Sequence, residues 1–319
     1  MANYPAYEDV KSIGIIGTGT IGASWASYFL SRGYDVTAWD PADGWQDKLG
    51  AFVENALPQL DAVGTSNGAR GKLTKVATPE EVAGATQFIQ ENAPERLNIK
   101  HELYARIDGA LVENENAIFA TSTSGLMMTD LAVNCRSANR MVVGHPFNPP
   151  HLIPLVEVVA GEKTDPEVKS WAHGFYNHIG KHAIYVNKEV PGHLANRLQA
   201  ALWREAFLAV KNGIATVEDV NAAIAQGPGL RLALMGPLMI FSLTSGRAGI
   251  GASLDHFGPP MLSWLETMTE QPELTAELRQ ALVDGIDEEM RGRTAEEMES
   301  LRDERLVKLL DMLRATERS

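Results

Sequence analysis

The chain has 319 residues, of which 45% are hydrophobic and 22% charged, and its formal net charge is −13. A chain of this length usually forms two domains, and its acidity argues against nucleic acid or an anionic membrane surface as a partner. It contains no run of about 20 apolar residues that would span a membrane, and its N-terminus lacks the basic and apolar segments of a secretion signal. Because Cys135 is the single cysteine, no intrachain disulfide is possible, and we expect a cytoplasmic protein.

Strand and helix patterns alternate through the first 190 residues. Alternation of this kind predicts a parallel, doubly wound sheet with helices on its faces. Strands are predicted at residues 13–16, 34–39, 87–90, 117–121, 140–144 and 155–159, and helices at residues 23–31 and 100–111.

From Pro191 onward the sequence has helical periodicity and no strand pattern. A helix predicted at 192–210 carries apolar residues on two faces, which indicates that it packs between other elements. The last predicted helix, at 294–316, is amphipathic and rich in Glu and Arg, as is typical of a helix on a surface or facing a partner. We therefore predict an α/β chain, with a doubly wound Rossmann-type domain at 1–190 and an all-helical domain at 191–319.

A glycine-rich turn follows the first predicted strand. Gly17, Gly19 and Gly22 fit the pattern G-x-G-x-x-G between a strand and a helix, where such a turn lets a pyrophosphate approach the backbone at the helix N-terminus. Asp40 ends the next strand. A carboxylate there accepts hydrogen bonds from the adenosine ribose and repels a 2′-phosphate, so the predicted cofactor is NAD rather than NADP.

His145 comes just after the apolar run 141–144, at the strand end where ligands of such sheets bind. Glu157 lies within the apolar run 153–159, where an unpaired carboxylate is costly to bury. A lone histidine is most often a core residue, and a lone glutamate often a strand-edge ion pair. Together they favour a catalytic acid–base pair, in which the carboxylate fixes the imidazole tautomer. The other histidines lack metal-ligand spacing, so no metal site is predicted.

Further segments accompany these motifs in the same order, at residues 92–100, 122–126, 145–148, 155–158 and 191–198. Together with the glycine turn, they resemble the 3-hydroxyacyl-CoA dehydrogenase family over nearly the whole chain. The resemblance implies a doubly wound NAD-binding domain followed by a helical domain that dimerises, so a homodimer is expected.

The resemblance also implies roles for single residues. The catalytic histidine falls on His145, its partner glutamate on Glu157, the substrate-contacting serine on Ser124 and a helical asparagine on Asn196. Without the resemblance, the loop 121–126 around Ser124 fits an ordinary turn as well as a substrate-binding loop. Cofactor contacts are predicted for the turn residues Thr20 and Ile21 and, by resemblance, for Glu95, Lys100 and Asn148.

Within the family, the chain most resembles the branch that acts on free hydroxy acids, which includes carnitine dehydrogenases and the L-gulonate 3-dehydrogenase related to lambda-crystallin. The carnitine dehydrogenases are the nearer likeness. The resemblance therefore implies NAD-dependent oxidation of the 3-hydroxyl of a small 3-hydroxy acid, with L-carnitine as the first expectation. The segments that carry it are 88–97, 142–149, 188–192, 201–206 and 227–231.

One position departs from that likeness. An aromatic residue is expected after Arg231, where this chain has Leu232. Aromatic faces usually hold a trimethylammonium group. Arg231 fits a substrate carboxylate as well as a surface ion pair. Three alternatives to L-carnitine oxidation therefore stay open. The substrate is L-gulonate or another short 3-hydroxy acid, or it is a 3-hydroxyacyl-CoA, or the protein has a non-catalytic, crystallin-like role. Aromatic residues that fit either a cation cage or the core are Trp203, Phe241, Phe257 and Trp264.

Overall fold

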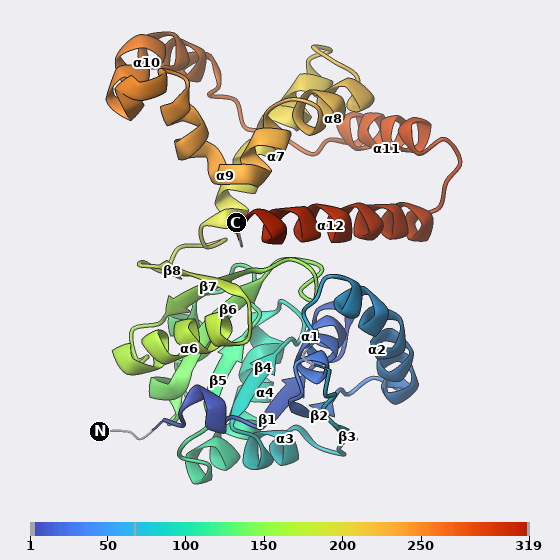
Figure 1. Ribbon diagram of the computed structural model, residues 1–319, viewed down its shortest axis with the longest axis vertical. Coiled ribbons are helices and arrows are strands. Elements are labelled where there is room, and N and C mark those ends of the chain that lie inside the picture. The colour runs from blue at the N-terminus through green and yellow to red at the C-terminus, as the bar shows by residue number, and fades with distance from the viewer. Residues whose placement is uncertain (1–3, 67, 318–319) are drawn as a thin grey trace. The chain divides into compact units, whose positions relative to one another are not determined.

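The computed structural model describes residues 4–66 and 68–317 (Figure 1). The chain divides into two compact units, the first comprising residues up to Asn196 together with Arg305–Ala315, and the second comprising Arg197–Glu304. This division differs from the predicted boundary at 190, chiefly because residues 305–315 lie with the first unit. The reason is apolar contact, since Leu310 is buried in a small cluster with Val63 and Leu152.

The first unit is built on one eight-stranded sheet with the strand order β3-β2-β1-β4-β5-β6-β7-β8. All neighbouring strands are parallel except β6 and β7, which are antiparallel. The predicted parallel, doubly wound sheet is confirmed, with this one antiparallel pair as an exception, because residues 147–154 between the two strands are too few for the crossover that parallel strands need. The strands are β1 (Ser12–Ile16), β2 (Asp35–Trp39), β3 (Leu73–Lys75), β4 (Phe88–Glu91), β5 (Ile118–Thr121), β6 (Met141–Pro146), β7 (Leu155–Ala160) and β8 (His182–Val186).

Helices cover both faces of this sheet (Figure 1). One core cluster joins α1, α2 and α6 to one face, and a second joins α3, α4 and α5 to the other. Consecutive strand residues such as Phe88 and Ile89 enter different clusters, which is why the central strands are apolar at almost every position. The helices are α1 (Thr20–Ser31), α2 (Trp45–Ala62), α3 (Pro79–Ala85), α4 (Leu97–Glu113), α5 (Met128–Leu131) and α6 (Pro166–His178), with short 3-10 turns at Tyr7–Asp9 and Ala138–Arg140.

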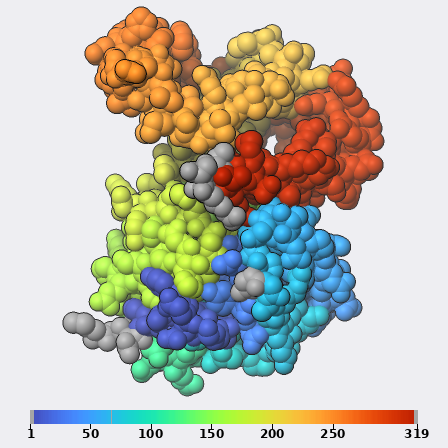
Figure 2. All heavy atoms as spheres, in the orientation of Figure 1, coloured from blue at the N-terminus to red at the C-terminus, as the bar shows by residue number. Residues whose placement is uncertain are grey.

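The N-terminal segment lies against α6 on the face shown in Figure 2, where the dark blue and yellow-green segments meet. The Tyr7 and Trp171 rings pack edge to face, with centroids 5.6 Å apart. The Trp171 indole also donates a hydrogen bond to the Pro5 carbonyl at 2.7 Å. These contacts add the first described residues to the same core cluster that buries α1 and α6.

The second unit consists of helices joined by loops and has no strand among its described residues. α9 bends at Gly236, whose φ of 73° is left-handed, and Pro237 follows with no N–H to donate. The expectation that the helix at 192–210 is packed on both faces is wrong for the single chain, because Leu198, Leu202 and Trp203 are exposed. The helices are α7 (Ala195–Lys211), α8 (Val217–Ala225), α9 (Pro228–Leu243), α10 (Gly249–Thr267), α11 (Ala276–Met290) and the first part of α12 (Ala295–Glu317), with a 3-10 turn at Gly246–Ala248.

In the described part of the chain, no individual helix combines the length and apolarity of a membrane span. α8 and α9 meet that criterion only when taken together, and they bend by 54° at their junction.

Candidate active site

The glycine turn joins β1 to α1, as predicted. Gly17 has a φ of 83°, and a Cβ on Gly22 would lie 1.8 Å from the Gly17 carbonyl oxygen, so both positions require glycine for the turn itself. A Cβ on Gly19 would meet no protein atom within 4 Å. The space beside Gly19 therefore suits the approach of a cofactor phosphate. Thr20 and Ile21 begin α1, where N–H groups lack helical partners and the helix dipole favours an anion.

Asp40 follows β2 and closes the turn from the other side. Its carboxylate accepts hydrogen bonds from the backbone N–H groups of Thr18 at 2.7 Å and Ala42 at 2.8 Å. These bonds fix the carboxylate beside the glycine turn, where it can accept further hydrogen bonds from ribose hydroxyls. The geometry therefore fits the adenosine half of NAD.

A pocket of about 540 Å³ lies at this edge of the sheet. Gly17, Gly19 and Asp40 line it from the turn, and Trp39 and Arg106 supply an aromatic ring and a guanidinium. The Arg106 guanidinium carbon lies 5.5 Å from the centroid of the Trp39 ring. A flat, largely apolar wall beside a carboxylate suits an adenosine, with the ring system packed on the wall and the ribose on the carboxylate.

His145 and Glu157 form the centre of the site. They are register partners in the antiparallel pair β6–β7, so both side chains project from the same face of the sheet. The His145 Nδ1 lies 2.8 Å from the Glu157 Oε2, and both side chains are buried. Because a carboxylate accepts the hydrogen bond, Nδ1 carries the hydrogen, and in a neutral ring Nε2 then has the lone pair. His145 lies within β6 rather than just after the strand, since pairing with β7 extends β6 to Pro146.

The second oxygen of Glu157 is held by backbone. The N–H groups of Leu194 and Ala195 both donate to Oε1 at 2.9 Å. Burial raises the pKa of the Glu157 carboxyl, but the hydrogen bonds from His145, Ala195 and Leu194 outweigh it and leave the pKa below its ordinary value. Glu157 therefore stays ionised beside the imidazole.

Ser124 lies on a loop that a single carboxylate holds. The Glu95 Oε1 accepts hydrogen bonds from the Thr123 hydroxyl at 2.7 Å and from the backbone N–H groups of Ser124 and Gly125 at 2.9 Å each. Burial raises the pKa of Glu95, but these bonds and the Lys100 charge bring it below its ordinary value. The Asn196 amide donates to the Ser124 carbonyl at 2.9 Å. The structure thus brings Ser124, Glu95 and Asn196 together, with Glu95 holding the serine loop.

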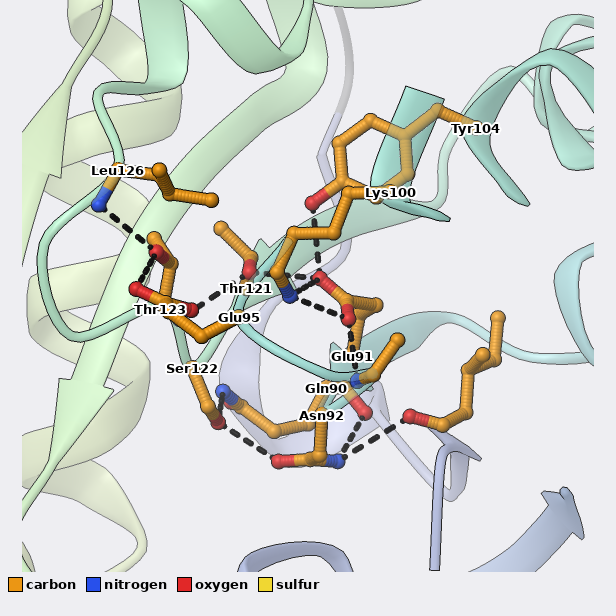
Figure 3. Close-up of polar contacts among 12 residues, drawn as sticks. Gln90, Glu91, Asn92, Glu95, Lys100, Tyr104, Thr121, Ser122, Thr123 and Leu126 are labelled. Carbon is orange, nitrogen blue, oxygen red and sulfur yellow. Dashed lines mark hydrogen bonds and ion pairs between the residues drawn. The ribbon is translucent and has the colours of Figure 1, made fainter. Parts of the chain in front are cut away.

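Lys100 was predicted beside the cofactor, but the structure engages it elsewhere. Its ammonium lies 2.7 and 2.9 Å from the two oxygens of Glu91, and both side chains are fully buried (Figure 3). The Tyr104 hydroxyl at 2.8 Å and the Thr121 hydroxyl at 2.6 Å donate to the same carboxylate. Lys100 therefore stabilises the cores of α4, β4 and β5 and leaves no donor exposed at the site.

The Glu91 cluster was not identified from the sequence. Its signal in the sequence is a carboxylate at the end of an apolar strand, whereas Glu157 lies within one. A second network lies beside it, in which the Ser122 hydroxyl donates to the Asn92 side-chain oxygen at 2.7 Å and accepts from the Gln90 amide at 2.8 Å (Figure 3). These bonds fix the carboxyl ends of β4 and β5, from which Glu95 and Ser124 extend.

The remaining predicted residues are exposed or half-buried. Asn148 is exposed on the connection between β6 and β7. Arg231 and Trp203 are exposed, and Phe241 is half-buried; all three belong to the second unit. Among the residues described, no ring contact joins Trp203, Phe241, Phe257 and Trp264 into a cage. Substrate contacts by these residues, and a nicotinamide contact by Asn148, stay predictions.

The fold and the site define a class, an NAD-binding dehydrogenase whose histidine–glutamate pair lies at the carboxyl edge of a doubly wound sheet. The family model of the 3-hydroxyacyl-CoA dehydrogenase NAD-binding domain matches residues 12–190, and that of the C-terminal domain matches residues 192–284. The chain belongs to the 3-hydroxyacyl-CoA dehydrogenase family. It is an NAD-dependent oxidoreductase, as the resemblance implied.

Curated relatives match almost the full chain. L-carnitine dehydrogenase of Streptomyces griseus is 48% identical over 98% of this chain and 92% of its own length, and that of Streptomyces coelicolor is 46% identical over 98% and 96%. Among solved structures, the NAD⁺-dependent 5-formyl-3-hydroxy-2-methylpyridine 4-carboxylic acid 5-dehydrogenase has a TM-score of 0.81 at 28% identity, over 97% of this chain and 99% of that one. The similarity therefore includes both domains.

Proposed function

We propose that the protein oxidises the 3-hydroxyl of L-carnitine to the ketone of 3-dehydrocarnitine, with NAD as the oxidant. The observation that carries the proposal is the buried His145–Glu157 pair, 2.8 Å apart, in a chain 40–48% identical to several L-carnitine dehydrogenases. An imidazole with a free Nε2 and a carboxylate on Nδ1 is the acid–base device that alcohol oxidation requires. The pair is thus matched to removing a hydroxyl proton.

NAD, when bound, supplies the hydride acceptor, and the residues of the glycine turn and Asp40 would hold it. The chain's own residues manage the proton. The His145 Nε2 accepts the proton of the substrate hydroxyl, and Glu157 stabilises the imidazolium that results. Ser124 orients the hydroxyl, and Asn196 steadies the Ser124 loop through its carbonyl. Since Glu157 has a lowered pKa and stays ionised, the imidazolium keeps its counter-ion throughout turnover.

A second candidate is another short 3-hydroxy acid, such as L-gulonate. It is favoured by Leu232, which stands where an aromatic residue would support a trimethylammonium group. The Arg231 guanidinium on α9 would pair with the carboxylate of either substrate. The two candidate substrates therefore require different residues to bind the end of the substrate that lies away from its carboxylate. The chemistry at the 3-hydroxyl is the same for both.

A substrate screen tests the proposal directly. We expect NADH formation with NAD and L-carnitine at a kcat/KM at least tenfold above that with L-gulonate or 3-hydroxybutyrate, about the discrimination that one well-placed group supplies. The reverse reaction with acetoacetyl-CoA and NADH tests the CoA-thioester alternative in the same assay. Preference for L-gulonate would support the second candidate, and absence of turnover on every 3-hydroxy acid would overturn both.

We also propose that the protein acts as a homodimer formed by the second unit. Large apolar side chains are exposed along α9 and α10, among them Leu238 at 73% and Trp264 at 64%. Contiguous exposed apolar faces of this kind mark interfaces. A second copy of the chain would cover the face, and a two-fold axis would place the same face on both partners. Further members of the face are Leu230, Leu234, Met235, Met239, Leu243, Leu254 and Leu265.

A further inference from the structure

A second buried histidine lies beside the catalytic pair. The rings of His193 and His145 have centroids 5.4 Å apart and planes inclined by 51°. The His193 side chain is only 1% exposed. Its backbone is left-handed, with a φ of 49°, a conformation that costs a non-glycine residue about 1 kcal/mol or more. Residues held in such conformations cluster at functional sites.

The segment around His193 holds two parts of the site at once. The His193 Nε2 lies 3.1 Å from the Thr123 carbonyl oxygen, and the Asn196 side-chain amide donates a hydrogen bond to the neighbouring carbonyl of Ser124. From the same segment, the N–H groups of Leu194 and Ala195 hold the Glu157 carboxylate. Residues 193–196 therefore connect the Ser124 loop to the partner of His145.

The hydrogen bond to Thr123 determines the tautomer of His193. A carbonyl oxygen only accepts, so the Nε2 carries the hydrogen and the Nδ1 of a neutral ring has a lone pair. That Nδ1 is buried and has no hydrogen-bond partner among the described residues. A protonated ring would bury an unsatisfied N–H as well as a charge, which is unfavourable in this environment.

The surrounding charges agree with a neutral ring. Burial is the main cause that lowers the pKa of His193 below its ordinary value, and the neighbouring His145 lowers it further. The two carboxylates that face it, Glu157 and Glu95, raise the pKa by less, as does the bond to Thr123. Both carboxylates already accept hydrogen bonds from other groups, Glu157 from His145 and Glu95 from the Ser124 loop.

We propose that His193 is a positioning residue of the dehydrogenase reaction, which as a neutral imidazole with its hydrogen on Nε2 holds the Ser124 loop in place against His145. The proposal rests on the proposed role of His145 as the base. In this arrangement the proton taken from the substrate stays on His145, because Glu157 faces His145 directly whereas His193 has no carboxylate bonded to its ring. His193 thus fixes the distance between the group that orients the hydroxyl and the group that deprotonates it.

Paired substitutions test this role. His193→Phe keeps a flat ring and removes the donor to Thr123, so kcat for the preferred 3-hydroxy acid should fall by about tenfold or more, as expected when a reacting group is misplaced. The KM for NAD should stay within about twofold, because the glycine turn and Asp40 are not contacted. His193→Gln places an amide N–H near the position of Nε2 and should recover at least about a third of the wild-type kcat.

His182→Phe serves as the matched control, since His182 is an exposed residue on β8, and its kcat should equal that of the wild type. A His193→Phe enzyme within twofold of the wild type would overturn the proposal. So would a His193→Gln enzyme as impaired as His193→Phe, because the N–H would then have no part in the effect.

Nitrogen NMR of the ¹⁵N-histidine-labelled protein gives a readout that needs neither turnover nor the Phe variant. The His193 signal, assigned by its loss in His193→Gln, should show a neutral ring protonated on Nε2 at pH 7. A cationic ring, or a ring protonated on Nδ1, would overturn the proposal whatever the substrate is. The wild-type protein could also show the expected signal and yet oxidise no 3-hydroxy acid. In that case the proposed function would fail, and His193 would have no catalytic role. The hydrogen bond from its Nε2 to Thr123 would still be confirmed.

Discussion

The two units of the chain differ in how completely they bury their apolar side chains. In the first, the central strands are buried at almost every position and two core clusters cover the sheet. In the second, buried apolar side chains are few among the described residues, and long runs of α9 and α10 are exposed. The first unit thus buries its apolar side chains within itself and holds the His145–Glu157 pair, whereas the second leaves apolar side chains exposed, which supports the proposed dimer.

Polar groups follow the same contrast. The carboxylates of Glu91, Glu95 and Glu157 are each held by three or more hydrogen bonds within the first unit. Ion pairs in the second unit, such as Lys211 with Glu270, join side chains that are partly exposed. Buried, fully bonded carboxylates rigidify their surroundings, and exposed pairs contribute little. The bonded carboxylates therefore hold the site on the first unit in a fixed arrangement.

Apart from the loss of His145 itself, the largest expected effect within the first unit comes from Glu157→Gln. The amide retains the volume but loses the charge that stabilises the His145 imidazolium, so kcat should fall by about 10³-fold. Steady-state rates with NAD and L-carnitine measure the change, and fluorescence titration with NADH should show unchanged cofactor binding. A kcat within tenfold of the wild type would mean that the buried carboxylate serves only the fold.

A smaller effect is expected from variants that shift the cofactor preference from NAD toward NADP. In Asp40→Ala combined with Ala42→Arg, the repulsion of a 2′-phosphate is lost and a guanidinium is supplied near it. The ratio of kcat/KM for NADP to that for NAD should rise by about 10²-fold, a change typical of gaining one charged contact. An unaltered ratio would show that the Asp40 carboxylate does not lie at the ribose.

The exposed face of the second unit is tested by Leu238→Asp. A charge buried at the centre of an apolar interface should raise the Kd of the dimer at least tenfold, which corresponds to a loss of about 1.4 kcal/mol of binding free energy. Sedimentation equilibrium measures the change, with Asp287→Ala on α11 as a control at an exposed charged position. A wild-type chain that is monomeric at micromolar concentration would contradict the proposed dimer.

The smallest effect concerns pH and stability. The pKa of His193 is lowered from its ordinary value of 6.5, so the unfolded chain takes up a proton before the native one does, and the free energy of unfolding should fall as the pH drops below 6.5. The lowered pKa values of Glu157 and Glu95 add a second fall below their ordinary value of 4.5. Urea unfolding at a series of pH values measures both. His193→Gln should flatten the first fall, and an equal slope in this variant would exclude His193 as its cause.

Much of the site follows from the sequence because its polar residues stand out against apolar strands. Glu157 and the glycine turn each violate the local pattern, and such violations mark function or strain. The pairing of His145 with Glu157 required only that the two strands be neighbours in the right register.

Other features give no such signal. Strand β3 has three residues, two of them polar, so no apolar run reveals it, whereas β8 does contain an apolar run, at residues 183–186, that the strand prediction left out. The reversed direction of β7 depends on the short connection at 147–154, and the position of Leu310 depends on tertiary contact alone. Lys100 matches the family's cofactor-side position, yet its ammonium is held by Glu91, a partner that only the packing of α4 on β4 provides.

The central claim is that His145 removes the hydroxyl proton, and one comparison tests it most directly. NADH formation from NAD and L-carnitine is followed at 340 nm for the wild type and for His145→Ala, with NADH binding measured on both proteins. We expect robust wild-type turnover, a loss of about 10³-fold or more in the variant and equal NADH affinity. A variant that turned over at a rate close to the wild type, while still binding NADH, would contradict it.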